Sequence, residues 1–170
     1  MKRLLILRHA KSSWAEAGLK DRERPLNKRG RRAAPLMGAR MARKDYRPEG
    51  ILCSPAVRTR ETLELVQPHL GADIPVRMEP RIYLASGRQL LALLHELPEA
   101  WSSALLIGHN PGLEELVRLL REPGKSPCEA PAKFPTAALA VVDFPVTGWA
   151  RVDVRMGRLV DLVKPRDIGG

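Results

Sequence analysis

Three short runs of consecutive apolar residues lie in the first two thirds of the chain, at residues 4–7, 50–53 and 104–107. Each run is shorter than a typical helix and apolar on both faces, which is the pattern of a strand buried in a parallel sheet. After each run, apolar residues recur every three or four positions, as they do on one face of a helix. This alternation predicts an α/β domain whose sheet is mostly parallel.

Four helices are expected between and after these strands. Each would begin at a side chain that can cap a helix, namely Asn27, Ser54, Ser86 and Asn110. A proline follows Ser54 and Asn110, which suits the first helical position, and Ser86 is followed by Gln89 in a capping-box pattern. Pro35 lies inside the first helix and predicts a kink or a later start.

The last third of the chain has a different pattern. Residues 122–135 contain four prolines and few apolar side chains, which predicts a loop. Residues 138–144 and 149–156 then read as two strands around a turn. Together these elements predict a three-layer α/β/α sandwich, with a mostly parallel sheet and a late hairpin or edge strands, formed as a single domain over residues 1–170.

The charge of the chain is strongly basic and unevenly placed. It contains 29 Lys+Arg and 19 Asp+Glu, a formal net charge of +10. Residues 1–60 hold 17 of the basic and 5 of the acidic residues, so this segment supplies the whole excess. Taken alone, a basic excess of this size points first to nucleic acid or another polyanion as the ligand.

Composition also excludes several classes of protein. Residues 1–60 contain only two aromatic side chains, Trp14 and Tyr46, whereas single-strand nucleic-acid binders need aromatic platforms among their basic residues. We therefore expect no nucleic-acid partner. The sequence has no apolar run of 18 residues, so no membrane span is expected. Cys53 and Cys128 lack the spacing of a zinc site or a disulfide framework, which favours reduced thiols in a cytoplasmic protein.

Candidate chemistry follows each of the three apolar runs. Arg8 and His9 come after the first, Arg58 shortly after the second, and His109 after the third. Because ligands bind beyond the carboxyl ends of strands in an open α/β sheet, these side chains are expected to meet at one edge. Guanidinium groups match phosphate oxygens, and imidazoles act as nucleophiles, acids or bases near neutral pH. The set is suited to phosphoryl transfer.

Four segments, in this order, resemble the motifs of the histidine phosphatase (phosphoglycerate mutase-like) superfamily. They are LRHA at residues 7–10, RPLNKRG at 24–30, SPAVRTRET at 54–62 and GHNP at 108–111. The FPTAA segment at 134–138 and the short chain resemble the SixA-type, phosphohistidine phosphatase branch. This resemblance implies an α/β phosphatase that needs neither a metal nor a cofactor.

The resemblance also implies roles for individual residues. His9 would be the nucleophile that carries the phosphoryl group, and Arg8, Arg58 and His109 would surround the phosphate oxygens. Arg24 would make an additional phosphate contact. Many members of the superfamily use a carboxylic acid to protonate the leaving oxygen, and the possible acid here is Glu79. Small SixA-like members lack a clear acid, which favours phosphohistidine over sugar phosphates as substrate.

The function we expect is hydrolysis of phosphate monoesters or phosphoramidates through a phosphohistidine intermediate, most of all on protein phosphohistidine. One alternative is a broad or small-molecule phosphomonoesterase, whose partner would be a small phosphorylated substrate. A further alternative is a non-catalytic module that binds phosphate or polyanions through the basic N-terminal third. The paired histidines argue against this last alternative, because a pure binder does not need them.

Overall fold

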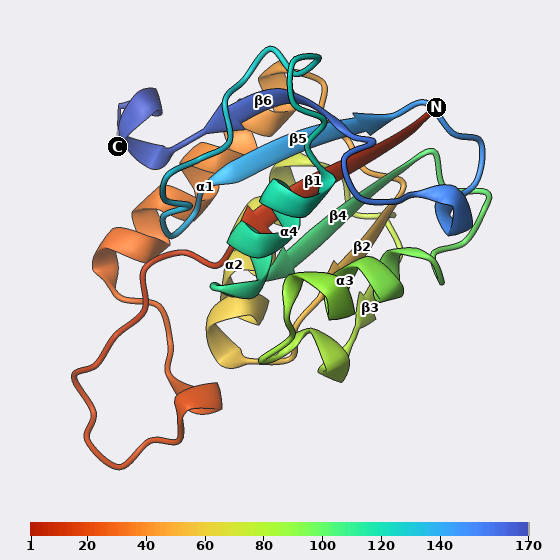
Figure 1. Ribbon diagram of the computed structural model, residues 1–170. Helices are drawn as coiled ribbons and strands as arrows, with labels where there is room; N and C mark the ends of the chain where they lie inside the picture. Colours follow the sequence, from red (N-terminus) through yellow and green to blue (C-terminus); the bar gives the residue numbers. More distant parts are fainter. Residues whose placement is uncertain (170) are drawn as a thin grey trace.

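A single mixed sheet forms the middle layer of the computed structural model, which describes residues 1–169 (Figure 1). Within these residues its six strands lie in the order β3-β2-β4-β1-β5-β6. The strands are β1 (Lys2–Arg8), β2 (Gly50–Cys53), β3 (Val76–Met78), β4 (Ser103–Gly108), β5 (Leu139–Phe144) and β6 (Arg158–Val163). Strands β1 to β4 run parallel, whereas β5 is antiparallel to β1 and to β6. The mostly parallel sheet with late edge strands is confirmed.

Helices cover both faces of the sheet, as the three-layer prediction requires. The helices are α1 (Lys28–Arg43), α2 (Val57–Val66), α3 (Gly87–Leu94) and α4 (Gly112–Leu120). On one face, buried side chains of α1 and α2 pack against Leu5 and Leu7 of β1. On the other face, α3 and α4 pack against Leu4 and Ile6 of the same strand. Strand β1 therefore contributes to both cores, which explains why its sequence is apolar without alternation.

The predicted helix starts are partly right. Asn27 caps α1 by accepting the Gly30 N–H at 2.9 Å, and Ser86 forms a capping box with Gln89 at the start of α3. Pro35 lies within an uninterrupted α1, so a later start is excluded. Helices α2 and α4 begin after Ala56 and Pro111, which is later than the predicted caps at Ser54 and Asn110. Asn110 still accepts the Glu114 N–H in the first turn of α4, whereas the Ser54 hydroxyl contacts His109 in the candidate active site.

The second late strand lies later than predicted. Residues 149–151 form a 3-10 helix, and the strand that pairs with β5 is β6. Trp149 is fully buried in this turn and donates its indole N–H to the Trp101 carbonyl at 2.8 Å. A buried tryptophan can therefore give a turn the apolar pattern of a strand. In the described residues, no helix has the length and apolar character that a membrane crossing requires.

Candidate active site

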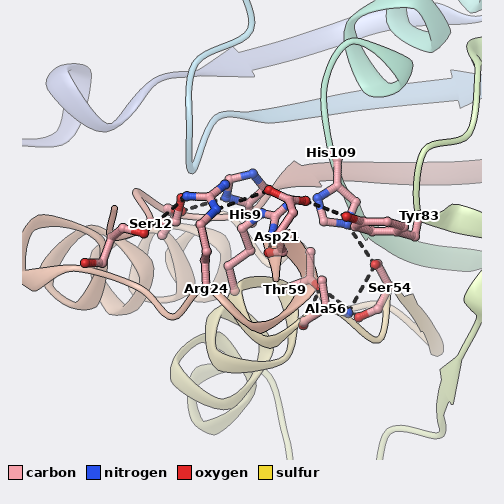
Figure 2. A network of polar contacts seen from close by, with 12 residues as sticks. His9, Ser12, Asp21, Arg24, Ser54, Ala56, Thr59, Tyr83 and His109 are labelled. Atoms are coloured by element: carbon pink, nitrogen blue, oxygen red, sulfur yellow. Dashed lines mark hydrogen bonds and ion pairs between the residues drawn. The ribbon is translucent and has the colours of Figure 1, made fainter. Parts of the chain in front are cut away.

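The carboxyl ends of β1, β2 and β4 meet at one edge of the sheet, where the side chains that follow them line a pocket (Figure 2). The backbone N–H of His9 donates to Gly108 and that of Ser54 donates to Ile107, both at 3.1 Å, so the ladder continues to the edge of the pocket. The pocket has a volume of about 210 Å³. Its lining residues are Arg8, His9, Lys11, Ser12, Trp14, Arg24, Arg58, His109, Asn110 and Thr136.

His9 is held as a neutral imidazole with a defined free nitrogen. Its Nδ1 lies 2.7 Å from the Ala10 carbonyl oxygen, and because a carbonyl only accepts, Nδ1 carries the proton. The lone pair is therefore on Nε2. The residue is only 6% exposed. This burial, with His109 and the cations Arg8 and Arg58 nearby, lowers the pKa of His9 to about 3.

The loop that carries His9 is fixed by neighbouring elements. The Ala10 N–H donates to Thr62 Oγ1 on α2 at 3.0 Å. The next loop residue, Lys11, accepts the Asn27 N–H through its carbonyl at 2.9 Å. At Gly30 the first turn of α1 passes so close that a Cβ would lie 2.2 Å from this carbonyl oxygen. Glycine in the RPLNKRG segment is thus required for α1 to pack against the loop.

Arg8, Arg58 and His109 line the pocket, and each has one buried nitrogen atom without a protein partner. Within residues 1–169, Arg8 Nε, Arg58 Nε and His109 Nδ1 are buried and have no hydrogen-bond partner. Burial is also the main reason why the pKa of Arg8 is lowered. Buried donors are normally satisfied in folded proteins, and three in one site indicate a place for an acceptor-rich anion.

His109 is oriented by Ser54 from the neighbouring strand end. Its Nε2 lies 2.7 Å from Ser54 Oγ. We assign the Ser54 hydroxyl proton to the hydrogen bond with Nε2, which places the imidazole proton on Nδ1. The same hydroxyl oxygen accepts the Ala56 N–H at 3.4 Å. The centroids of the His9 and His109 rings are 5.4 Å apart. Burial, together with Arg58, lowers the pKa of His109 to about 4.

Arg24 also lines the pocket, as its motif implied. Its Nη1 donates to Ser12 Oγ at 2.8 Å, and its guanidinium group lies 3.5 Å from the centre of the Trp14 ring. Arg24 is buried, whereas Trp14 is 76% exposed. Stacking on an exposed indole therefore holds this guanidinium group at the mouth of the pocket.

Asp21 links the two arginines that flank the pocket and was not among the predicted site residues. Its carboxylate accepts from Arg24 Nε at 3.1 Å and from Arg58 Nη2 at 3.0 Å, and its carbonyl accepts from Arg58 Nη1 at 2.7 Å. The Tyr83 hydroxyl donates to the same carboxylate. The hydrogen bond from Tyr83, and next those from the arginines, lower the pKa of Asp21 to about 2. Asp21 is therefore an ionised carboxylate at neutral pH.

A second hollow adjoins the pocket, and Tyr83 lies in its wall together with Asp21. That hollow has a volume of about 440 Å³, is lined by Asp21 and Tyr83, and shares Arg58, His109 and Asn110 with the pocket. Tyr83 contacts His109 edge to face, with ring centroids 5.4 Å apart. Nothing in the spacing of the charged residues at 20–24 distinguishes Asp21 from a surface charge, so the sequence carried no usable signal for it.

Glu79, which was predicted as the possible acid, forms an ion pair with Arg81. Its carboxylate accepts the Arg81 N–H at 3.0 Å and pairs with the Arg81 guanidinium group at 2.7 Å. It lines neither the pocket nor the adjoining hollow. Arg81 lowers the pKa of Glu79, so this carboxyl group is ionised at neutral pH.

Asn110 and Thr136 line the pocket although neither was predicted to. Asn110 donates from Nδ2 to the Phe134 carbonyl at 2.8 Å and accepts the Glu114 N–H at 3.2 Å. Arg8 Nη1 donates to the same Phe134 carbonyl at 3.1 Å. The FPTAA segment thus forms one wall of the pocket, and its resemblance to the SixA-type branch was the signal that could have identified Thr136.

A metal centre is not indicated by the side chains of this site. In the part of the chain that the structure describes, no group of three or more His, Cys, Asp or Glu side chains is arranged to hold a metal ion.

Comparison with known proteins agrees with this geometry. Residues 4–83 match the model of the histidine phosphatase superfamily (branch 1). An uncharacterised protein of Mycobacterium tuberculosis is 33% identical over 165 residues, which cover 94% of this chain and 100% of that protein. The crystal structure of the putative phosphohistidine phosphatase SixA from Agrobacterium tumefaciens is similar with a TM-score of 0.81, at 32% identity, over 96% of this chain and 98% of that one.

A structure of the protein histidine phosphatase SixA complexed with tungstate is also similar, with a TM-score of 0.79, at 26% identity, over 97% of this chain and 98% of that one. An α/β sheet whose edge joins a buried imidazole, a half-buried imidazole and three guanidinium groups is suited to an enzyme that handles phosphate. With these comparisons the family is established. The chain belongs to the histidine phosphatase superfamily, in its SixA-type branch, and is a phosphatase.

Proposed function

We propose that this phosphatase removes the phosphoryl group from phosphohistidine on a protein, through a phosphorylated His9. The observation that carries the proposal is the buried, neutral His9 with its lone pair on Nε2, in a pocket where Arg8, Arg58 and His109 have unpartnered buried donors within residues 1–169. The likeness to a SixA structure complexed with tungstate supports an oxyanion at the corresponding place.

The first step transfers the phosphoryl group to His9. The Nε2 lone pair attacks phosphorus and forms a P–N bond, while the P–N bond to the substrate imidazole breaks. Because the pKa of His9 is lowered to about 3, the lone pair is available across the physiological pH range. The arginines and the His109 Nδ1–H stabilise the charge on the equatorial oxygens.

The second step is hydrolysis of the phosphoenzyme. With a phosphoryl group on Nε2 and a proton on Nδ1, the His9 ring is cationic, and the Ala10 carbonyl at 2.7 Å stabilises the Nδ1–H. Water attacks phosphorus, the P–Nε2 bond breaks with its electron pair returning to Nε2, and His9 leaves as a neutral imidazole. The proton of the water passes to the phosphate. The hydrogen bond to Ala10 thus assists both the attack of Nε2 on phosphorus and its later release from the phosphoryl group.

The leaving group explains the preference for phosphohistidine. Asp21 is the carboxylate nearest to the pocket arginines, and its pKa of about 2 leaves it without a proton to donate. A sugar alkoxide needs such a proton. A substrate phosphohistidine instead takes a proton from solvent on its free ring nitrogen near neutral pH and departs as neutral imidazole. The absence of a protonated carboxyl group therefore favours phosphoramidates over alkyl phosphates.

The test uses two peptides of identical sequence that carry either phosphohistidine or phosphoserine. We expect kcat/KM for the phosphohistidine peptide to exceed that for the phosphoserine peptide by about 100-fold or more, which corresponds to roughly 3 kcal/mol of transition-state stabilisation. A label on the enzyme that survives alkaline denaturation and is lost in acid identifies phospho-His9. Equal or higher activity on sugar phosphates would instead establish the small-molecule phosphomonoesterase, and absence of any label would contradict the covalent mechanism.

A further inference from the structure

A basic groove adjoins the active-site pocket on the side of α1. It has a volume of about 450 Å³ and shares Lys11 and Thr136 with the pocket, so the two hollows are adjacent. Its walls come from the first half of α1, the end of the proline-rich loop and the segment after β6. The residues that line this basic groove are Lys11, Arg29, Ala33, Ala132, Lys133, Pro135, Thr136, Lys164, Pro165 and Arg166.

The charges of the basic groove have one sign. Five of its lining residues are cationic, namely Lys11, Arg29, Lys133, Lys164 and Arg166, and none is acidic. Within residues 1–169 none of the five takes part in an ion pair. Asp167, the acidic residue nearest to them in sequence, is turned to the Lys164 backbone N–H at 2.9 Å. Five like charges around one hollow repel one another, and an anionic ligand would relieve that repulsion.

The floor of the basic groove distinguishes between anionic ligands. Ala33, Pro135 and Pro165 are half-buried there, and no lining residue is aromatic. A nucleic-acid strand would need aromatic surfaces on which its bases could stack. A short peptide segment places its carboxylates on the cationic rim and its aliphatic carbons on an apolar floor. The combination of rim and floor therefore favours an acidic peptide.

We propose that the basic groove binds an acidic segment of the phosphoprotein substrate while its phosphohistidine occupies the adjoining pocket. The proposal rests on the proposed function, because it names the part of that same substrate which the enzyme recognises outside the phosphate. Because Lys11 and Thr136 line both hollows, a single extended peptide can contact both of them. The groove thereby selects among phosphohistidine proteins by the acidity of the sequence that flanks the phosphohistidine.

The test reverses two charges of the groove and two matched charges elsewhere. The groove variant is Arg29→Glu with Arg166→Glu, which lie at the second position of α1 and in the 3-10 helix Pro165–Ile168. The control is Arg88→Glu with Arg151→Glu, which lie at the second position of α3 and in the 3-10 helix Trp149–Arg151. All four arginines are exposed, and none lines the pocket. The two variants therefore have the same net charge and similar helix-end substitutions.

Two phosphohistidine peptides serve as substrates, one with aspartate and glutamate in its flanks and one with asparagine and glutamine at the same positions. We expect the unmodified enzyme to prefer the acidic peptide by about tenfold in kcat/KM, through a lower KM, because several rim charges each contribute modestly. The groove variant should lose this preference and keep its activity on the neutral peptide. The control variant should retain the preference. Added salt should weaken the preference in the unmodified enzyme.

Binding without chemistry separates failure of this proposal from failure of the proposed function. Fluorescence anisotropy with the unphosphorylated acidic peptide and with a single-stranded oligonucleotide measures the groove alone. Groove-dependent binding of the peptide, without turnover of either phosphopeptide, would support the groove and overturn the proposed function. Turnover with equal kcat/KM for the two phosphopeptides would overturn the groove proposal. Tighter groove-dependent binding of the oligonucleotide than of the peptide would also overturn it.

Discussion

Two arginine–carboxylate clusters lie beyond the carboxyl ends of neighbouring strands, and their arginines differ in burial. Arg58 has a side chain that is 7% exposed and pairs with Asp21, yet its Nε is buried without a partner within residues 1–169. Arg81 has a side chain that is 58% exposed and pairs with both Glu79 and Glu96, at 2.7 and 3.0 Å. An ion pair is common to both clusters. Of the two arginines, only Arg58 is buried with an unpartnered Nε, and because it also lines the pocket we assign it to the anion site.

The largest effect is expected at His9, which lines the same pocket as Arg58. Replacing His9 with Ala should lower kcat by about 10⁴-fold or more, because it removes the nucleophile while the binding groups remain. Turnover of a phosphohistidine peptide measures the loss. His69→Ala is the control, since His69 is a half-buried histidine in the 3-10 helix Gln67–His69, outside the pocket. Activity of the His9 variant within tenfold of the unmodified enzyme would contradict covalent catalysis.

The two arginines themselves provide the next largest effect. Arg58→Ala should reduce kcat/KM by about 10²- to 10³-fold, since one buried donor to the transferred phosphoryl group is lost. Arg81→Ala should change kcat/KM by less than about twofold, because an exposed ion pair contributes little. Thermal unfolding of both variants controls for stability. Similar losses at the two positions would mean that burial does not distinguish the clusters.

The pH dependence tests whether the buried cluster keeps both imidazoles neutral. The pKa of His9 is lowered to about 3 and that of His109 to about 4, chiefly by burial. Protonation removes the His9 lone pair, so activity is lost as the pH falls through these values and is kept above them. After correction for ionisation of the substrate, kcat/KM should be flat from about pH 8 to pH 5. A decline centred near pH 6.5 would indicate ordinary, solvated histidines.

The sequence predicted the site residues that directly follow strands better than the other residues of the site. Arg8, His9 and His109 follow apolar strands directly, and the register that pairs Arg8 with Gly108 brings those strand ends together. Glu79 was predicted from its position in the chain, but the Arg81 side chain two residues later draws it to the surface cluster.

Residues that reach the site from loops could not be predicted in this way. Asp21 lies between β1 and α1, where no periodic pattern fixes the path of the backbone, and its contacts depend on Arg58, 37 residues away, and on Tyr83, 62 residues away. Asn110 looked like a helix cap because its side chain type and the following proline fit one. Only the position of the Phe134 carbonyl turns it toward the pocket wall.

Replacing Asp21 should lower kcat less than replacing Arg58 lowers kcat/KM, because Asp21 positions the arginines and does not contact the phosphate. Asp21→Asn keeps an oxygen for Arg24 or Arg58 but removes the charge that holds both guanidinium groups. We expect kcat to fall by about tenfold as the arginines lose their fixed orientation. KM should not rise, because a negative charge beside the phosphate is removed at the same time. Steady-state kinetics on one phosphohistidine peptide separates the two terms, and a rise in KM with constant kcat would show that Asp21 contacts substrate instead of positioning the arginines.

Glu79→Gln should have the smallest effect and tests the surface cluster directly. Gln keeps the side-chain oxygen that accepts the Arg81 N–H, and Arg81 retains Glu96 as an ionic partner. We expect kcat/KM for phosphohistidine and for phosphoserine peptides to stay within about twofold of the unmodified enzyme. The informative quantity is the ratio of the two. A selective loss on phosphoserine would mean that Glu79 protonates the leaving oxygen during turnover. It would then contradict the conclusion that the Arg81–Glu79 cluster takes no part in catalysis.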